Sequence, residues 1–317
     1  MKSLKDYASE IQKCSKCGLC QSVCPVYKVT GNDCAVSRGK FVMLDGVLKG
    51  ELKLGKNIEK YLDQCLKCGK CTDFCPSGID VCDILYAAKA ECFKFSIPLT
   101  PAPLPLREEG AQLLYFSGCF NRVLRKHPLK KLAAAEDPGF GCCGFPYLSA
   151  GDVKRFGKCV EHNKNLAGNK LVITDCASCA HMLKKCGINA VNAAEYLESP
   201  PAPPLTRGAL PKVTFHKPCH MENTDFLKPL LRNAEYIEMK DFDACCGFGG
   251  EFALKNNKIS REIAKQKAEN ILATGADVVL TACPGCILGL HQGLFGRKAP
   301  KIMNIVDFLA TTDSHPL

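Results

Sequence analysis

The stretch Cys65-Leu66-Lys67-Cys68-Gly69-Lys70-Cys71-Thr72-Asp73-Phe74-Cys75-Pro76 is a C-x2-C-x2-C-x3-C-P run. In such a run three closely spaced thiolates bind one iron–sulfur cluster, and the cysteine before the proline binds a second cluster. A second copy is therefore required, and Cys14 to Pro25 repeats the spacing. This exchange rule predicts two 4Fe-4S clusters, one held by Cys14, Cys17, Cys20 and Cys75 and the other by Cys65, Cys68, Cys71 and Cys24.

Composition supports metal ligation by the cysteines. C-x2-C pairs also suit zinc, but zinc sites use two such pairs and not two four-cysteine runs that each end in proline. The 317 residues contain 23 cysteines in clusters, and no stretch resembles a signal peptide or a membrane span. We therefore expect a reducing, cytoplasmic location, and peripheral attachment to the inner face of a membrane stays open.

The formal charge of +10 raises the question of nucleic-acid binding. Each cluster with four thiolates carries a net charge of about −2, so two clusters reduce the total to about +6. The basic residues form no arginine-rich stripe interleaved with aromatic residues. We expect no nucleic-acid partner, and the lysines are interpreted mostly as solvated or partner-docking surface.

The chain is expected to be a multidomain α+β protein. Residues 1–12, 38–48 and 81–93 have helical spacing around the two cysteine runs, and Ser3 and Asp6 form a capping box. Two proline clusters divide the chain. The expected layout is a helical ferredoxin domain at 1–96, a linker at 97–110, a Cys-Cys-Gly domain at 111–198, a linker at 199–211 and a second Cys-Cys-Gly domain at 212–317.

The last two domains are interpreted as a duplication. Each contains a short run with strand-forming residues followed by a lone cysteine, a Cys-Cys-Gly-Phe motif and a second such run followed by C-x2-C. The four runs, at 113–116, 171–174, 213–216 and 278–281, alternate with helical segments such as 257–273, which indicates a parallel α/β sheet. Ligands gather beyond the carboxyl ends of such strands, so the cysteines are expected to converge there.

Each Cys-Cys-Gly domain contributes five candidate metal ligands. They are Cys119, Cys142, Cys143, Cys176 and Cys179 in the first domain and Cys219, Cys245, Cys246, Cys283 and Cys286 in the second. Structural zinc needs four ligands and would leave a fifth thiol idle, so iron–sulfur ligation is preferred. The other five cysteines are interpreted as small buried hydrophobic residues: Cys34, Cys82, Cys92, Cys159 and Cys186.

Two ferredoxin runs followed by two Cys-Cys-Gly domains resemble a known family. It contains the iron–sulfur subunits of glycolate oxidase and of anaerobic glycerol-3-phosphate dehydrogenase, the lactate-utilisation iron–sulfur proteins and the catalytic subunit of heterodisulfide reductase. The segments from Ser37 to Lys40 and from His216 to His220 look similar to that family as well. The resemblance implies an electron-transfer subunit with one or two further iron–sulfur clusters in the Cys-Cys-Gly domains, whose five-cysteine motifs can bind non-cubane 4Fe-4S clusters, as in heterodisulfide reductase. The type of cluster in each domain stays open from the sequence.

Two functions remain open from the sequence. In the first, a partner flavoprotein dehydrogenase oxidises a 2-hydroxy acid such as glycolate or lactate, or glycerol-3-phosphate, and this chain passes the electrons to a quinone or other carrier. In the second, the Cys-Cys-Gly clusters themselves reduce a disulfide. No flavin or nicotinamide fingerprint is found, and no catalytic residue is assigned. His216 and His220, beside Cys219, either form hydrogen bonds to backbone or sulfur atoms or deliver protons.

Overall fold

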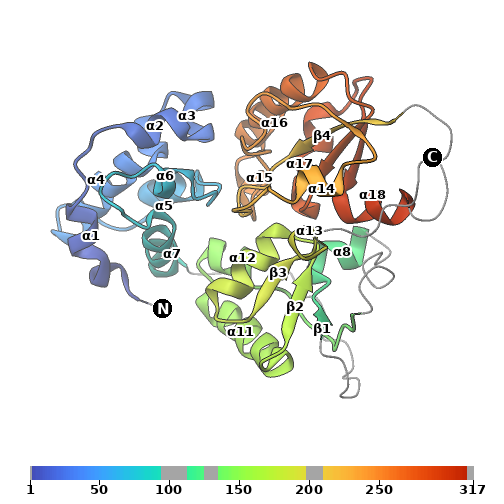
Figure 1. The fold of residues 1–317 in the computed structure, drawn as a ribbon. Coiled ribbons are helices and arrows are strands. Elements are labelled where there is room, and N and C mark those ends of the chain that lie inside the picture. Colours follow the sequence, from blue (N-terminus) through green and yellow to red (C-terminus); the bar gives the residue numbers. More distant parts are fainter. Residues whose placement is uncertain (1, 94–112, 125–134, 198–209, 313–317) are drawn as a thin grey trace. The chain divides into compact units, whose positions relative to one another are not determined.

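The computed structural model describes residues 2–93, 113–124, 135–197 and 210–312 (Figure 1). Two compact units are treated separately: the described residues of 1–99, 144–157 and 247–263 form the first, and the remaining described residues form the second. The linker expected at 97–110 lies outside the described residues, as does 199–209 of the other linker. The expected domain limits therefore stay predictions.

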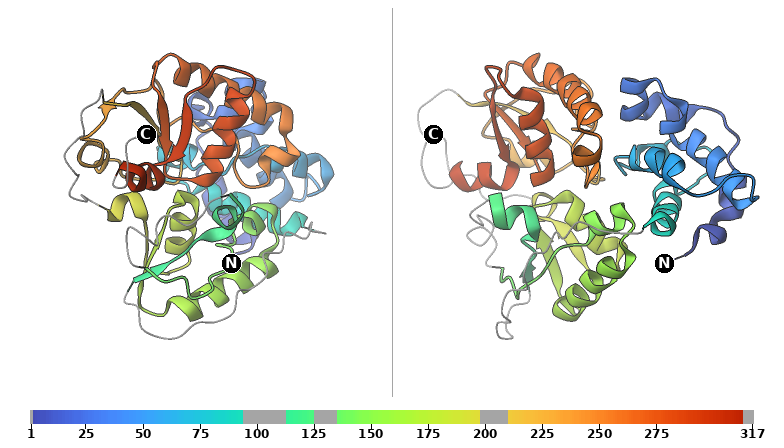
Figure 2. Two further views of the ribbon diagram at one scale, coloured as in Figure 1. Left: turned by 90° about the vertical axis from the view of Figure 1, so that its right-hand side faces the viewer. Right: turned by 180° about the vertical axis from the view of Figure 1, so that it is seen from behind.

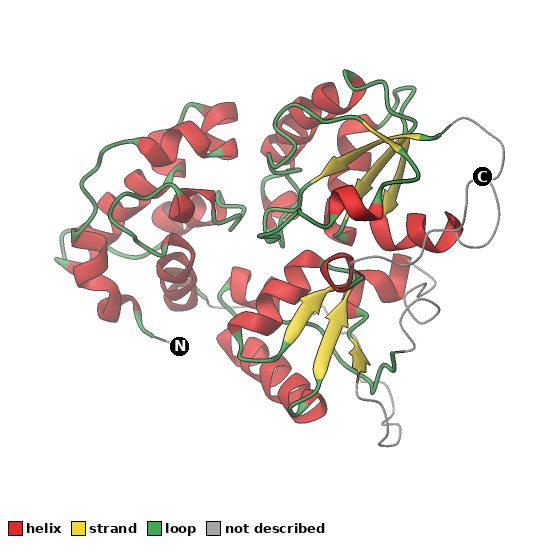
Figure 3. Ribbon diagram, viewed as in Figure 1, coloured by secondary structure: helices red, strands yellow, loops and turns green. Residues whose placement is uncertain are grey.

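The regular elements of the first unit are all helices among its described residues (Figure 3). The helices expected at 38–48 and 81–93 are confirmed. The one expected at 1–12 is a 3-10 turn continued by α1, and Ser3 and Asp6 form the expected capping box. The elements are 3-10 turns at Leu4–Tyr7 and Asp33–Ala35, α1 (Ala8–Gln12), α2 (Leu19–Val23), α3 (Pro25–Thr30), α4 (Ser37–Leu48), α5 (Lys56–Asp63), α6 (Lys70–Asp73), α7 (Val81–Cys92), α10 (Phe145–Ala150) and α15 (Phe252–Lys255).

A hydrophobic core supports the two cysteine runs. It is built from α1, α4, α5 and α7, and Leu44, Leu62 and Ile84 at its centre are fully buried. Four cysteines of the two runs pack against this core: Cys14, Cys65, Cys71 and Cys75. Core packing therefore fixes the backbone from which the thiols project.

The second unit contains two parallel sheets (Figures 1 and 2). The first sheet has the order β1-β2-β3 and the second the order β5-β4-β6-β7. All four strands expected from the sequence are present, whereas β3, β5 and β7 were not expected. The strands are β1 (Leu113–Tyr115), β2 (Leu171–Thr174), β3 (Ala190–Asn192), β4 (Lys212–His216), β5 (Glu235–Tyr236), β6 (Val278–Thr281) and β7 (Lys301–Asn304).

The two sheets have equivalent topology. A parallel bridge between Leu114 and Glu136 occupies the place in the first sheet that β5 has in the second. The repeated order supports a duplication. Helices of this unit are α8 (Gly118–Leu124), α12 (Ala177–Lys185), α13 (Ala193–Tyr196), α14 (Leu227–Leu230), α17 (Pro284–Leu294) and α18 (Ile305–Thr312), and α11 (Val153–Ala167) and α16 (Asn257–Leu272) begin in the first unit and end in the second.

Among the described residues, no helix has both the length and the apolar character needed to span a lipid bilayer.

A buried ion pair in the first unit gives a stability prediction. Lys89 is 1% exposed, and its Nζ lies 2.6 Å from Asp63 Oδ1 and 3.1 Å from Glu59 Oε1. Lys89→Met should destabilise the protein by about 1–3 kcal/mol, because it removes the cation from Glu59 and leaves Asp63 with only the more exposed Lys255. The measurement is the thermal unfolding midpoint under anaerobic conditions.

The matched control is Lys49→Met, which removes an exposed i,i+4 pair with Asp45. Exposed pairs contribute little, so this variant should unfold close to wild type. Equal midpoints for the two variants would contradict the assigned role of Lys89.

Candidate iron–sulfur centres

The two cysteine runs fold into matching loops. Gly18 and Gly69 have φ values of 89° and 80°, and the preceding Lys16 and Lys67 also have positive φ, 58° and 55°. These left-handed residues turn the chain tightly between successive cysteines. As a result, the Lys67 amide lies 3.5 Å from Cys65 Sγ, as a donor to sulfur. The loop conformation is therefore suited to a sulfur-ligated centre.

One pocket in the first unit is lined by the thiols of the first run together with one cysteine of the second. Cys14, Cys17, Cys20 and Cys75 all line it, as does Pro76. The pocket has an empty volume of about 390 Å³, part of it open to solvent. Its donor set matches the one expected for the first cluster, with Cys75 as the exchanged ligand.

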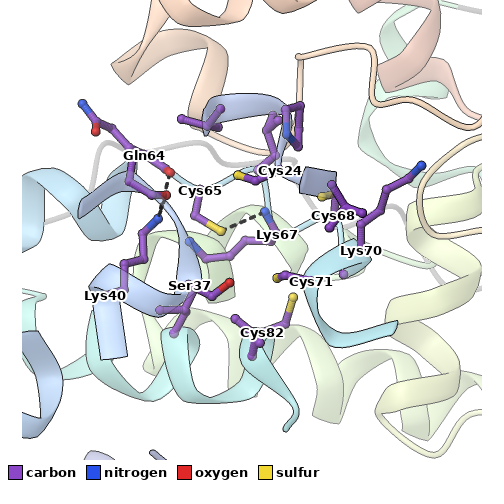
Figure 4. A pocket seen from close by; sticks show the side chains of 18 residues that line it. Cys24, Ser37, Lys40, Gln64, Cys65, Lys67, Cys68, Lys70, Cys71 and Cys82 are labelled. Atoms are coloured by element: carbon purple, nitrogen blue, oxygen red, sulfur yellow. Dashed lines mark hydrogen bonds between the residues drawn. The ribbon is translucent and has the colours of Figure 1, made fainter. Parts of the chain in front are cut away.

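The other pocket has the complementary donor set (Figure 4). It is lined by Cys65, Cys68, Cys71 and Cys24 and has an empty volume of about 430 Å³. Cys24 caps α3, where its Sγ accepts a hydrogen bond from the Tyr27 amide at 3.5 Å. Pro25 fits the first turn of that helix because it has no N–H to satisfy. The closing Cys-Pro of the run thus starts a helix that fixes Cys24 in the second pocket.

Two buried lysines surround this second pocket. Lys40 is 1% exposed and Lys67 3% exposed, and both line the pocket. Lys40 Nζ donates to Gln64 O at 3.1 Å and Lys67 Nζ to Leu62 O at 3.3 Å. Burial by itself would raise the pKa of Cys65, but the charges of Lys67 and Lys40 outweigh it and lower that pKa. The pocket therefore favours thiolate and a negatively charged cluster.

These lysines give a prediction for the reduction potential. Lys67→Met should lower the potential of the cluster held by the Cys65 run, because a buried ammonium stabilises the more negative, reduced cluster. Redox titration followed by EPR measures the shift.

Lys16→Met is the control, because Lys16 has the same place in the first run but is exposed. It should change the potential of the first cluster much less. Shifts of equal size in both variants would contradict the assigned role of Lys67.

The exchanged ligands give a second prediction. Cys75→Ser and Cys17→Ser should impair the same cluster, and Cys24→Ser and Cys68→Ser the other, because each pair lines one pocket. Iron content and EPR spectra of the four variants measure this grouping.

Cys34→Ser controls for loss of a thiol as such, because Cys34 lines neither of these pockets. If Cys75→Ser grouped with Cys68→Ser, the ligand exchange would be wrong.

The Cys-Cys-Gly cysteines gather in the second unit. In the first repeat, Cys119 Sγ lies 3.9 Å from Cys142 Sγ, and the thiols of Cys143 and Cys176 raise the pKa of Cys179. The second repeat has the same pairings. The thiol of Cys245 raises the pKa of Cys219, and the thiols of Cys246 and Cys283 raise that of Cys286. The expected convergence beyond the strand ends is therefore present in each repeat.

The two repeats also meet at their cysteines. Cys176 Sγ lies 3.8 Å from Cys283 Sγ, and these residues have equivalent places after β2 and β6. Hydrogen bonding with the thiols of Cys176 and Cys286 lowers the pKa of Cys283 well below its ordinary value. One buried series of neighbouring thiols thus crosses between the repeats: Cys143, Cys179, Cys176, Cys283, Cys286 and Cys246.

A reciprocal pair of asparagines fixes this junction. Asn192 Nδ2 donates to Ala282 O at 3.2 Å, and the equivalent Asn304 Nδ2 donates to Asp175 O at 2.9 Å. Each side-chain oxygen accepts from the amide two residues later, at Ala194 and Val306. Neither asparagine was predicted from the sequence, although each stands two residues before one of two similar segments, Ala194-Glu195-Tyr196-Leu197 and Val306-Asp307-Phe308-Leu309.

The two candidate histidines have different surroundings. His216 is fully buried at the end of β4, and its ring lies with the thiols of Cys246 and Cys286. The His220 Nδ1 lies 3.0 Å from Ser178 Oγ, and its ring stacks on His181 at 4.8 Å between centroids. The buried Lys40, Lys67 and Lys267 were not expected either, because the lysines were interpreted mostly as surface. Cys82, expected in the core, lines the second pocket (Figure 4).

Comparison with known families agrees with this organisation. Residues 10–79 match the 4Fe-4S dicluster domain, and residues 113–184 and 213–291 each match the cysteine-rich domain. The chain is therefore an iron–sulfur protein that combines these two kinds of domain. All three domains contain many cysteines, in donor sets that suit clusters. This iron–sulfur protein therefore carries multiple iron–sulfur clusters.

Several known proteins align with nearly the whole length of this chain. The chain is 26% identical to one subunit of the fumarate reductase (CoM/CoB) of Methanothermobacter marburgensis, over 96% of this chain and 73% of that protein. It is 23% identical to one subunit of the dihydromethanophenazine:CoB–CoM heterodisulfide reductase of Methanosarcina mazei, over 95% and 93%. It is 22% identical to the glycolate oxidase iron–sulfur subunit of Escherichia coli, over 92% of each chain. The resemblance stated from the sequence is confirmed.

Proposed function

We propose that this chain is the iron–sulfur subunit of an oxidoreductase complex and carries electrons from a partner flavoprotein dehydrogenase to a quinone or other carrier. The partner would oxidise a 2-hydroxy acid such as glycolate or lactate, or glycerol-3-phosphate. Similarity to subunits of glycolate oxidase and heterodisulfide reductase supports the general role. The proposed ligands are the eight ferredoxin cysteines and the ten Cys-Cys-Gly cysteines assigned above.

The observation that carries this proposal is the shared wall between the two ferredoxin pockets. Cys71, Ser37 and Val81 line both pockets. Clusters in adjacent pockets can exchange single electrons, which is what a carrier between a two-electron donor and an acceptor requires. Lys40 and Lys67 place buried charges at only one of the two pockets, so the reduction potentials of the two clusters should be unequal. The pair is thus suited to directional transfer.

The electron balance assigns the organic chemistry to the partner. Oxidation of a 2-hydroxy acid to the 2-oxo acid releases two electrons and two protons, which a flavin accepts together. This chain would take the electrons singly. A quinone acceptor would then take up two electrons and two protons. The cysteines and lysines of this chain hold and tune the clusters, and no group in it needs to bind the hydroxy acid.

The first test is reduction of the isolated complex. After anaerobic purification with its native partner, addition of glycolate, lactate or glycerol-3-phosphate should bleach the iron–sulfur absorbance near about 400 nm, and quinone should restore it. Cys246→Ser should lose the signal of the second repeat, whereas Cys92→Ser should retain it, because Cys92 lies in the helical core. A partner without flavin, or clusters that no donor reduces, would contradict the proposal.

A second candidate function rests on the junction of the repeats. The contact between Cys176 and Cys283 brings thiols of two potential cluster sites to 3.8 Å, where two electrons could reach one disulfide. Cleavage of a disulfide to two thiols consumes two electrons and two protons. In the same experiment, reoxidation of the reduced clusters by a disulfide and not by quinone would favour this reductase over the carrier.

A further inference from the structure

The two Cys-Cys-Gly repeats differ at one buried position beside the metal ligands. His216 in the second repeat and Phe116 in the first both end the opening strand run, three residues before the lone cysteine. Both side chains are fully buried. The His216 ring nitrogen, Cys246 Sγ and Cys286 Sγ all lie within 4.8 Å of one another. The second repeat therefore has a nitrogen donor where the first has an aromatic hydrocarbon ring.

This spacing suits donors of one metal centre. Two ligands of a single tetrahedral metal lie about 3.6 Å apart, and ligands on neighbouring irons of a cluster lie further apart. Cys246 and Cys286 come from the Cys-Cys-Gly and C-x2-C motifs, so His216 joins thiols that are already candidate ligands. The glycine at position 289 lets α17 pack closely against this group, because a Cβ there would lie 2.9 Å from Cys246 Sγ.

A second difference between the repeats also places a more basic group beside the thiols of the second repeat. Lys267 is 2% exposed, its Nζ donates to Asp241 O at 2.6 Å, and its charge acts on Cys246 and Cys286. In the first repeat, the neutral Asn163 lies beside the Cys-Cys loop and donates to Cys142 O at 2.9 Å. The second repeat thus has a buried amine near its thiols where the first has a neutral amide side chain.

We propose that His216 is a nitrogen ligand of the iron–sulfur cluster in the second repeat, which makes the two Cys-Cys-Gly centres chemically different. This proposal rests on the presence of a cluster there, as in the proposed function. A neutral imidazole adds less negative charge than a thiolate and raises the reduction potential of a cluster. The second-repeat centre is then the stronger electron acceptor of the two.

The test is pulsed EPR on the full chain with its clusters, reduced or oxidised chemically so that no partner or donor is needed. Wild type should show strong coupling of the second-repeat cluster to a histidine nitrogen, and the pattern should change when histidine is labelled with ¹⁵N. His216→Phe, which copies the first repeat, should lose the coupling. His216→Cys should keep the iron, lose the coupling and lower the potential, because thiolate replaces imidazole.

His220→Phe is the matched control, because His220 contacts Ser178 and its coupling to the cluster should be absent. This variant should retain the wild-type signal. The proposal is overturned if wild type shows no histidine coupling, if coupling persists in both His216 variants, or if the site holds a single zinc ion. A complex that fails to accept electrons from a hydroxy acid yet shows the coupling would refute only the proposed function.

Discussion

The whole structure depends on holding many thiol groups close together without the repulsion of their charges. In the second ferredoxin pocket, burial raises the pKa of Cys24, and burial and the neighbouring Cys65 raise that of Cys71 to about 12. Iron binding removes the protons and offsets the electrostatic cost. Buried ammonium groups assist where they are present, as Lys40 and Lys67 do at Cys65. The fold is therefore organised to present sulfur atoms to metal.

The chain contains two duplications, and each brings its thiols together in a different way. In the ferredoxin part, each run donates its last cysteine to the pocket of the other, so neither donor set is complete within one run. In the Cys-Cys-Gly part, each repeat has a full five-cysteine set, and the side chains of Asn192 and Asn304 join the repeats by donating to backbone carbonyls across the junction. Buried amides whose side-chain nitrogen and oxygen are both hydrogen-bonded favour one arrangement, so the asparagines fix the register of the two repeats.

The sequence predicted the features that depend on local spacing. The two runs, the four strand segments and the duplication all follow from patterns within a few residues. Burial of Lys67 could not be predicted, because the equivalent Lys16 has the same position between cysteines of the first run and is exposed. The approach of Cys176 to Cys283 depends on contacts between residues 107 positions apart, which no local pattern encodes. The short strands β3, β5 and β7 are defined mainly by pairing with their neighbours.

In both duplicated parts of the chain, equivalent positions differ in the same way: the second copy has the more basic buried side chain. The second ferredoxin run has the buried Lys67 where the first has the exposed Lys16, and the second Cys-Cys-Gly repeat has His216 where the first has Phe116. In each duplication, the second copy has the environment that better stabilises added negative charge. Two identical centres would share an electron equally. Under the proposals above, unequal copies would favour movement of an electron from the first copy to the second, so divergence after duplication would supply a driving force that repetition by itself lacks.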